Sequence, residues 1–361
     1  YVAELAGSGN YGAWAEGPHL PEARTDAGAA FRAGKAYVVG GAGPDGAPSA
    51  TTYVLSPDPA TGALGTWDPD EALALPAARR GGTLVAAADG LIYVGGADES
   101  GPTTTVWKAN LDSKGGLSAW KPQAELAAAR VDANAAIIGD FLWVYGGSDA
   151  AGPSRLVQIG RIVKEVVADP SVTPPTMIDV FGTQPETSPL HLPEARTNAA
   201  GFTANGALYL VGGSDGTGGR GELYWTIPDP ESATLTVDDS TGTGWHHLVG
   251  SDLPTGGLAG GAAIVNGPNA FIIGGTGGDG VIASAARTNL APKPPFFQVS
   301  LLGGVTIPAL KIEGEIGQQL GYLSAAGVAT VNFAVLLFIA WAYAHPDRAL
   351  ALWRRVRRRS A

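Results

Sequence analysis

The chain has 361 residues, of which 53 are glycine, 26 are proline and only 16% are charged, a composition that suits many short strands and turns and is poor for helices. It contains no cysteine, which excludes disulfides, thiolate metal sites and cysteine nucleophiles. The formal net charge of −10 is unevenly distributed, because arginines gather at the C-terminus.

The first elements along the chain are short strands bounded by glycine. Residues 1–18 predict two of them, the second of which carries Trp14. The segment that follows predicts four more strands: Arg24–Phe31, Lys35–Val39, Thr51–Leu55 and one that carries Trp67. The double glycine Gly40-Gly41 allows a tight exit from the second of these four strands, where the backbone needs positive φ or a side chain would clash.

This arrangement repeats five times in a nearly fixed register. A leucine (Leu20, Leu75, Leu126, Leu192 or Leu253) precedes the first glycine of each pair by 20, 20, 20, 20 and 21 residues. The pairs are Gly40-Gly41, Gly95-Gly96, Gly146-Gly147, Gly212-Gly213 and Gly274-Gly275. Constant spacing within units and variable spacing between them indicate a structural repeat, and four strands per unit of about fifty residues are typical of a β-propeller blade.

The repeat resembles the Kelch family. The resemblance rests on the Leu-Pro-x-x-Arg segments Leu20–Arg24 and Leu192–Arg196, the apolar strand before each double glycine and the following tryptophan. It implies an all-β, Kelch-type β-propeller over residues 1–291, an architecture that hosts many functions. Unit four departs from the pattern, with Phe181 where the others have tryptophan, and unit five has Thr255-Gly256-Gly257 where the others reach arginine.

The number of blades follows from how the ring closes. Residues 1–18 are similar to the outer half of a blade whose inner half would precede the sequence, so we expect an incomplete first blade and missing upstream residues. Completing that blade gives six blades, which we prefer, and seven stay open. Alternatively, Phe296–Val299 supplies the missing half and closes the ring within the chain.

The C-terminal residues predict a membrane anchor. Residues 325–344 form an uncharged run of twenty residues, long enough to cross the roughly 30 Å hydrocarbon core as a helix. Trp341 and Tyr343 lie near one end of this run, where aromatic rings prefer the membrane interface. Residues 292–324 connect propeller and span, and are apolar enough to pack on a partner or lie at the interface.

Charge orients this predicted single-pass span. The tail, residues 345–361, carries one aspartate and six arginines: Arg348, Arg354, Arg355, Arg357, Arg358 and Arg359. The preceding chain holds 17 basic and 32 acidic residues, a net charge of −15. By the positive-inside rule the tail is cytoplasmic, in contact with the anionic bilayer surface, and the propeller is extracytoplasmic. Arginines beside a span indicate topology, so we expect no nucleic-acid partner.

Four arginines share one register, sixteen residues before the double glycines: Arg24, Arg79, Arg130 and Arg196. A ring fold would place them as a partial crown at one mouth of the central channel. Guanidinium groups there could hold a carboxylate, a sulfate or an acidic peptide, and in some Kelch propellers arginines near this register line a ligand pocket. The alternative is structural: each arginine ties neighbouring blades together, with Glu22 and Glu194 as candidate partners.

Other motifs argue against metals, cofactors and common catalytic sites. Calcium needs six or more converging oxygens, whereas the loops after the double glycines offer one or two aspartates each and are better explained as Asx turns; these aspartates are Asp45, Asp98, Asp149, Asp215 and Asp279. His246 and His247 are adjacent, so on a strand they would face opposite sides. No nucleophile elbow, phosphate loop or His-Glu-x-x-His motif is present.

Two functions therefore stay open. The favoured one is a non-catalytic propeller on a membrane anchor, a bacterial accessory subunit that docks on a protein partner in a membrane or cell-surface complex. The alternative uses the arginine crown to bind a glycan or acidic ligand, or for an activity like that of the sialic-acid mutarotases that share the Kelch-type fold. The absence of cysteine removes the copper-radical oxidase type, which needs a cysteine-linked tyrosine.

Overall fold

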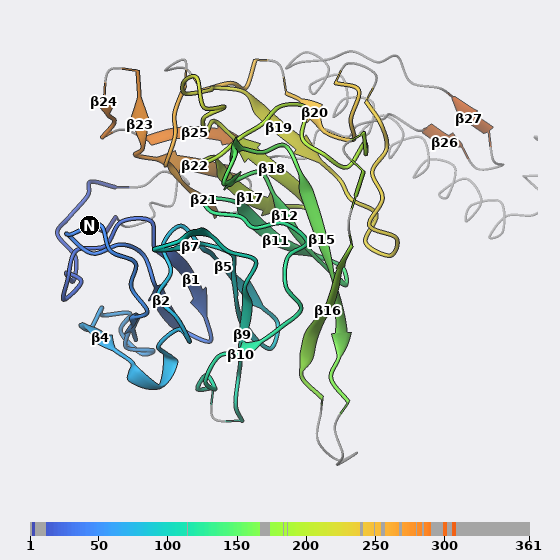
Figure 1. Cartoon of the computed structure of the whole chain (residues 1–361). Helices are drawn as coiled ribbons and strands as arrows, with labels where there is room; N and C mark the ends of the chain where they lie inside the picture. The colour runs from blue at the N-terminus through green and yellow to red at the C-terminus, as the bar shows by residue number, and fades with distance from the viewer. Residues whose placement is uncertain are drawn as a thin grey trace, which may run out of the picture. The chain divides into compact units, whose positions relative to one another are not determined.

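A computed structural model describes two compact units, Tyr1–Asn289 and Leu290–Ala361 (Figure 1). The described residues are 2–3, 12–113, 115–166, 174–182, 184–185, 187–238, 241–248, 250–253, 257–266, 269–278, 280–283, 285–289, 299–301 and 305–307.

The first unit contains five radial sheets, which are the blades of a β-propeller. Blades one and two are β1 (Gly28–Arg32), β2 (Lys35–Val39), β3 (Thr52–Leu55) and β4 (Trp67–Pro69), then β5 (Thr83–Ala87), β6 (Gly90–Val94), β9 (Val106–Asn110) and β10 (Lys121–Pro122). Blades three and four are β11 (Asn134–Ile138), β12 (Phe141–Tyr145), β15 (Val157–Lys164) and β16 (Thr176–Gly182), then β17 (Ala200–Ala204), β18 (Ala207–Val211), β19 (Leu223–Thr226) and β20 (His246–His247).

Blade five has three described strands, β21 (Ala262–Asn266), β22 (Asn269–Ile273) and β25 (Ala285–Asn289). Three small hairpins follow the double glycines of blades two, three and five: β7–β8 (Ala97–Asp98, Gly101–Pro102), β13–β14 (Ser148–Asp149, Gly152–Pro153) and β23–β24 (Thr276–Gly277, Gly280–Val281). A single-turn helix, η1 (Glu71–Leu73), precedes blade two. Figure 1 shows the blades following one another from blue to orange, and consecutive inner strands β1, β5, β11, β17 and β21 contact each other.

The inner hairpin of each blade is built from local turn chemistry. In blade one β1 pairs antiparallel with β2 across Ala33 and Gly34, whose φ angles are 50° and 78°, as in the primed two-residue turns that suit twisted hairpins. The inner strand starts at Gly28 rather than at the predicted Arg24, because Asp26 has a φ of 51°. A left-handed residue cannot continue an extended strand.

The double glycines are required for two reasons. All five pairs have positive φ, between 64° and 105°, a region that residues with a Cβ rarely adopt. The next blade also approaches closely: a Cβ on Gly95 would lie 2.4 Å from the carbonyl oxygen of Arg130. The predicted tight exit is therefore confirmed, and its cause is the neighbouring blade.

Apolar clusters fill the spaces between blades. In the described part, one cluster joins Val39 of blade one and Tyr93 of blade two, a second joins blades two and three, and a third joins blades three and four. Trp120 and Trp245 are buried in these clusters, and their Nε1 atoms donate to the carbonyls of Leu73 (2.7 Å) and Leu190 (3.0 Å). Each tryptophan thus fixes its outer strand to the segment that leads into the same blade.

The prediction of six or seven blades is wrong for the described residues, which form five. In the predicted half blade, Val2 and Ala15 do pair antiparallel, with N–O distances of 2.9 and 2.8 Å, but only as an isolated bridge. The alternative closure by Phe296–Val299 lies largely outside the described residues. Val299 begins β26 (Val299–Leu301), which pairs with β27 (Val305–Ile307).

Among the residues that the structure describes, none of the helices has the length and apolar character needed to cross a membrane. The predicted span 325–344, its aromatic residues Trp341 and Tyr343, and the arginine tail 345–361 all lie outside the described residues.

Gly95→Ala tests the double role of the glycines. A left-handed alanine costs about 1–2 kcal/mol, and the contact with the carbonyl of Arg130 adds an overpacking penalty of about 1–3 kcal/mol. Gly46→Ala is the matched control, because Gly46 has a φ of 78° and open space around its Cβ position. Thermal unfolding followed by tryptophan fluorescence is expected to show the larger loss for Gly95→Ala; equal losses would contradict the blade contact.

Candidate functional site

The four arginines of the predicted crown lie just before the inner strands of blades one to four, and their side chains are buried. Arg130 and Arg196 are each 1% exposed and Arg79 is 6% exposed. The side chain of Arg24 is 4% exposed. The guanidinium groups therefore lie inside the protein wall, not on an open rim.

Each guanidinium makes the same local hydrogen bond and has a nearby carboxylate. The Nη1 atom donates to the carbonyl of the preceding alanine, at distances of 3.3, 2.8, 2.6 and 2.9 Å along the chain. The nearest carboxylates are Glu22 at 2.7 Å from Arg24, Asp98 at 3.6 Å from Arg79, Asp149 at 3.2 Å from Arg130, and Glu194 and Glu222 at 2.9 and 3.0 Å from Arg196. Glu22 and Glu194 are ion-pair partners as predicted, but each lies two residues before its arginine, so these side-chain pairs do not join neighbouring blades.

Further contacts hold the guanidinium planes in place. Arg79 lies 4.9 Å from the ring centre of Trp107, and Arg24 and Arg196 each lie 5.6 Å from a tyrosine ring centre. Such cation–π contacts add to the ion pairs when desolvated. Arg130 donates instead to the hydroxyl of Ser154 at 3.0 Å.

In three blades, the Nε–H donor of the register arginine has no acceptor among the described residues. The Nε atoms of Arg24, Arg130 and Arg196 are buried and have no hydrogen-bond partner within the described protein. In blade two the Nε of Arg79 donates to the hydroxyl of Thr105 at 3.3 Å. A buried N–H without an acceptor is unfavourable, so each of these three Nε–H groups could donate a hydrogen bond to the oxygen of a water or a ligand.

The backbone of the same register joins neighbouring blades. The N–H of Gly41 donates to the carbonyl of Arg79 (2.9 Å), and the N–H of Arg79 donates back to Ser49 (2.9 Å). In the next two joints, the N–H groups of Gly96 and Gly147 donate in the same way to the carbonyls of Arg130 and Arg196, at 2.8 and 2.7 Å. These are bonds between blades, so the register has a structural role whatever its side chains bind.

Blade five has a leucine in this register. Counting sixteen residues back from Gly274 reaches Leu258, and the carbonyl of Leu258 accepts from Gly213 at 2.6 Å. Counting four residues forward from Leu253, as in the other units, reaches Gly257 instead. Unit five has one extra residue between its leucine and its double glycine, and this residue lies before Leu258, so only the count back from the glycines finds the residue that contacts blade four.

A second register, two residues further on, was missed by the sequence reasoning. Its members all have left-handed φ angles, of 51°, 62°, 55°, 51° and 72°: Asp26, Gly81, Asp132, Asn198 and Gly260. From Gly81 onward, the N–H of each member donates to the carbonyl of the preceding member, at 2.8, 2.7, 3.2 and 2.7 Å. We call these five residues the left-handed belt. Its sequence signal is the restriction to Asp, Asn and Gly, the residues that tolerate this conformation.

Asp132 is the titratable group of the belt whose environment is most unusual. Burial raises the pKa of this carboxyl to about 6, and the nearby Asp26 acts in the same direction. Arg80 and the side-chain amide of Asn198, 3.4 Å away, oppose the rise only in part. The carboxylate also covers Gly81, where a Cβ would lie 2.4 Å from its Oδ1.

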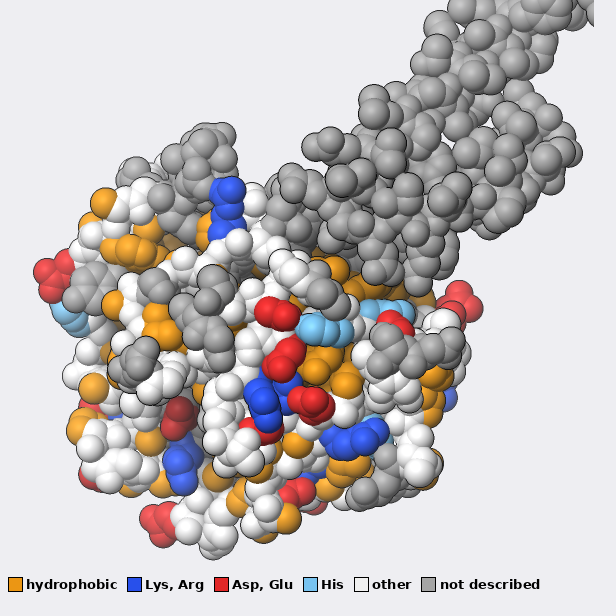
Figure 2. Space-filling view, turned by 90° about the horizontal axis from the view of Figure 1, so that it is seen from above, with side chains coloured by type: hydrophobic (Ala, Val, Ile, Leu, Met, Phe, Trp, Pro, Cys, Tyr) orange, Lys and Arg blue, Asp and Glu red, His pale blue; other side chains and the backbone are white. Residues whose placement is uncertain are grey.

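Blade four carries additional charges beside its arginine. Arg220 pairs with Asp215 and holds the pKa of that carboxyl well below its usual range. On β20, His246 pairs with Asp238 and His247 with Asp252, the latter at 2.9 Å. The two histidines thus have different partners, as the strand alternation predicts. Figure 2 shows histidine, acidic and basic side chains gathered on one face of the molecule.

The aspartates after the double glycines form turns. Oδ1 atoms accept from the backbone N–H two residues on, at 3.0 Å for Asp45, 2.8 Å for Asp98 and Asp149, and 2.9 Å for Asp215. The predicted Asx turns are confirmed at these four positions, while Asp279 lies outside the described residues. Within the described ranges no cluster of three or more His, Asp or Glu side chains is arranged to hold a metal ion.

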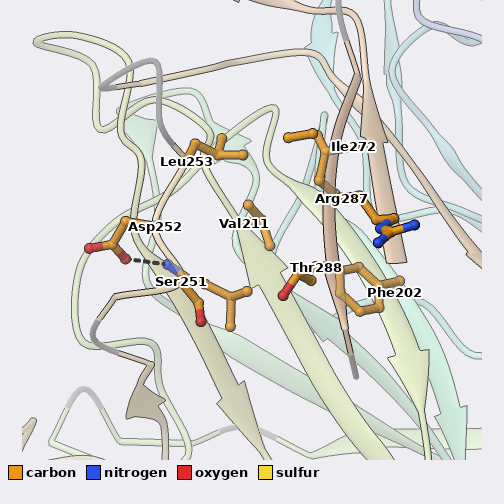
Figure 3. A pocket seen from close by; sticks show the side chains of 10 residues that line it. Phe202, Val211, Ser251, Asp252, Leu253, Ile272, Arg287 and Thr288 are labelled. Carbon is orange, nitrogen blue, oxygen red and sulfur yellow. Dashed lines mark hydrogen bonds between the residues drawn. The ribbon is translucent and has the colours of Figure 1, made fainter. Parts of the chain in front are cut away.

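A small cavity of about 50 Å³ lies between blades four and five. Figure 3 shows Phe202, Val211 and Ile272 around it, with Thr288 and Arg287 turned to opposite sides of β25. The carboxylate of Asp252 is held by the backbone N–H of Leu223 at 3.2 Å. A space of this volume has room for a water molecule or two and is too small for a sugar.

Comparison with known proteins gives no functional assignment, because no protein-family model and no curated protein matches this chain. The β-propeller is observed directly in the fold, whereas the Kelch resemblance stays a prediction from the sequence motifs.

Arg130→Ala tests the structural use of the register. Removing the guanidinium leaves the carbonyl of Ala129 and the partly exposed carboxylate of Asp149 without their donor, and losing a hydrogen bond to a charged group costs about 1.5–3 kcal/mol. Arg161→Ala is the control, because Arg161 is an exposed residue of β15 and such surface changes stay within about 0.5 kcal/mol. Urea unfolding of the full chain measures both; a loss for Arg130→Ala as small as the control's would exclude a structural role.

Asp132→Asn tests the buried carboxyl of the belt. An unperturbed aspartate has a pKa of about 3.9, so with a pKa of about 6 the folded protein holds a proton that the unfolded chain releases between these values. The resulting stabilisation is complete below about pH 4 and lost as pH rises through about 6.

The substitution is therefore expected to raise the free energy of unfolding at pH 7 by up to about 3 kcal/mol and to have little effect at pH 4. Asp45→Asn, in an exposed turn, serves as the control. Urea unfolding at the two pH values measures the difference, and an equal gain at pH 4 and pH 7 would show that charge on Asp132 is not the cause.

Proposed function

We propose that this chain is a bacterial, membrane-anchored member of the Kelch-type propellers and acts as a non-catalytic protein-interaction or assembly module. The propeller lies outside the membrane, residues 325–344 cross it once, and the arginine tail stays in the cytoplasm. The protein partner belongs to a membrane or cell-surface complex, of which this chain is an accessory subunit.

The observation that carries the proposal is the internal use of the arginine register. All four guanidinium groups are buried, and carbonyls and carboxylates of the propeller itself neutralise them. Charged groups already paired in this way contribute little to ligand capture, because a ligand would have to displace their partners. With the arginines committed to the blades, the outer surfaces of the propeller are the better docking sites.

The membrane part of the proposal rests on the sequence. Twenty uncharged residues match the length of a spanning helix, and six arginines follow them directly. An anchor of this kind confines the propeller to one membrane face, which raises its effective concentration near membrane-bound partners.

One observation favours the alternative of an acidic-ligand or glycan site. Three arginines keep an unpartnered Nε–H in the same register, and a donor of this kind can donate a hydrogen bond to a carboxylate oxygen of a sialic acid or acidic peptide. A mutarotase-like enzyme would use the same groups. This alternative requires that the ligand reach atoms that the blades now cover.

A direct test separates the two functions. Full-length protein in mild detergent is titrated with N-acetylneuraminate by calorimetry and, separately, cross-linked in its native membrane and analysed by mass spectrometry. The proposal predicts no saturable heat and cross-links from propeller residues to another polypeptide. Saturable binding that Arg130→Gln abolishes and the exposed Arg161→Gln preserves would replace it with the alternative. Cross-links confined to this chain would contradict an interaction role.

A further inference from the structure

Four joints between blades share one pattern of backbone hydrogen bonds. In each joint the second glycine of a pair donates to the register residue of the next blade, at 2.9, 2.8, 2.7 and 2.6 Å along the chain. The register residue donates back to the loop after the double glycine, at 2.9, 3.0, 3.2 and 3.0 Å. The left-handed belt adds a third bond. Among the described residues no such joint links blade five to blade one, and we call this gap in the pattern the seam.

The double glycine of blade five nevertheless has the backbone conformation that the other blades use to contact the next blade. Gly274 and Gly275 keep φ angles of 65° and 105°, although no register carbonyl contacts them within the described chain. A Cβ on the first glycine would lie 2.4–2.7 Å from that carbonyl in blades one to four, whereas on Gly274 the nearest atom, the oxygen of Ile282, is 3.7 Å away. Among the residues that the structure describes, nothing fills the place that a neighbouring backbone takes in the other four blades.

The side chains that face the seam are apolar and exposed. Six residues after the register, Val85, Ala136 and Phe202 face the next blade and are 7–8% exposed, but Ile264 at the same position of blade five is 42% exposed. On the other side, Ala29 of β1 is exposed, whereas its blade-two equivalent, Leu84, is buried against blade one.

We propose that the seam is a docking site for an apolar β-hairpin supplied by the protein partner. This rests on the interaction function proposed above and names the surface and the kind of partner. An inserted hairpin would repeat the joint on both sides.

The open backbone groups define the chemistry of the occupant. On the side of blade five, Gly275 offers an N–H and Ile282 a carbonyl, so the partner must present one extended residue with a free carbonyl and a free N–H. On the side of blade one, Arg24 offers the complementary N–H and carbonyl, so a second strand edge is needed. Two strand edges and an apolar face together describe a hairpin, which binds by adding strands and burying side chains.

Cysteine labelling tests the seam, because the natural chain has no cysteine. Ile264→Cys and Ala29→Cys place thiols on its two sides. Val166→Cys, at a residue 97% exposed on blade three, is the matched control. Reaction rates with a maleimide are compared in native membranes and in purified full-length protein in mild detergent. We expect both seam thiols to react as fast as the control in the purified chain and at least about tenfold more slowly in membranes.

Three results would overturn the proposal. Slow labelling in the purified chain would mean that residues of this chain, or a second copy if the protection depends on concentration, already close the seam. Fast labelling in both preparations, with cross-links to another polypeptide elsewhere on the propeller, would leave the interaction function standing and remove the seam from it. Fast labelling with no external cross-links would remove both.

Gly274→Ala tests the backbone contact itself. The added Cβ has room in the free propeller, with 3.7 Å to the nearest atom, but would meet the carbonyl of an inserted strand. The variant is expected to restore fast labelling of Ile264→Cys in membranes. Gly280→Ala is the control, because Gly280 also has a positive φ, of 106°, but nothing lies within 4 Å of its Cβ position; this variant preserves the protection. Unchanged protection in Gly274→Ala would show that the partner covers the seam without entering the joint.

Discussion

The propeller depends on one interaction, the backbone joint between a double glycine and the register residue of the next blade. Its geometry requires glycine, because a Cβ on Gly95 would lie 2.4 Å from the carbonyl oxygen of Arg130. The constant distance between leucine and glycine in the sequence follows from it, since both ends of that segment are fixed against neighbouring backbone. Blades thus associate through main-chain bonds that require the double glycine but leave the side chain of the register residue free to vary, as Leu258 of blade five shows. Apolar clusters between the blades supply the larger stabilisation.

The sequence predicted blade type well and blade number poorly. Strand positions such as Lys35–Val39 follow from glycine-bounded β-branched and aromatic residues, which act locally. The number of blades depends on how the ends of the array meet, and the periodicity within a unit carries no information on this. The bridge between Val2 and Ala15 fits the predicted strand pair, but no further sheet forms around it among the described residues.

The candidate site, too, could be predicted from the sequence only in part. Alignment of the repeats located all four arginines, yet their burial could not be predicted, because it depends on Glu222, Ser154 and other residues that approach only in the folded blade. The left-handed belt carried a readable signal in the restriction of one position to Asp, Asn and Gly. It was missed because Asp26 lay within a predicted strand, where φ is negative. Asp132 became unusual only through burial.

Because the arginines are engaged within the blades, we propose the surfaces where the repeat stops, rather than the central channel, as the binding sites. The most direct measurement is amide hydrogen exchange of the second glycines in the purified full chain. The account predicts that Gly96, Gly147 and Gly213 exchange slowly, because their N–H groups bond the next blade, and that Gly275 exchanges much faster. Equal protection at Gly275 would show that the chain completes this joint itself and would contradict an open seam.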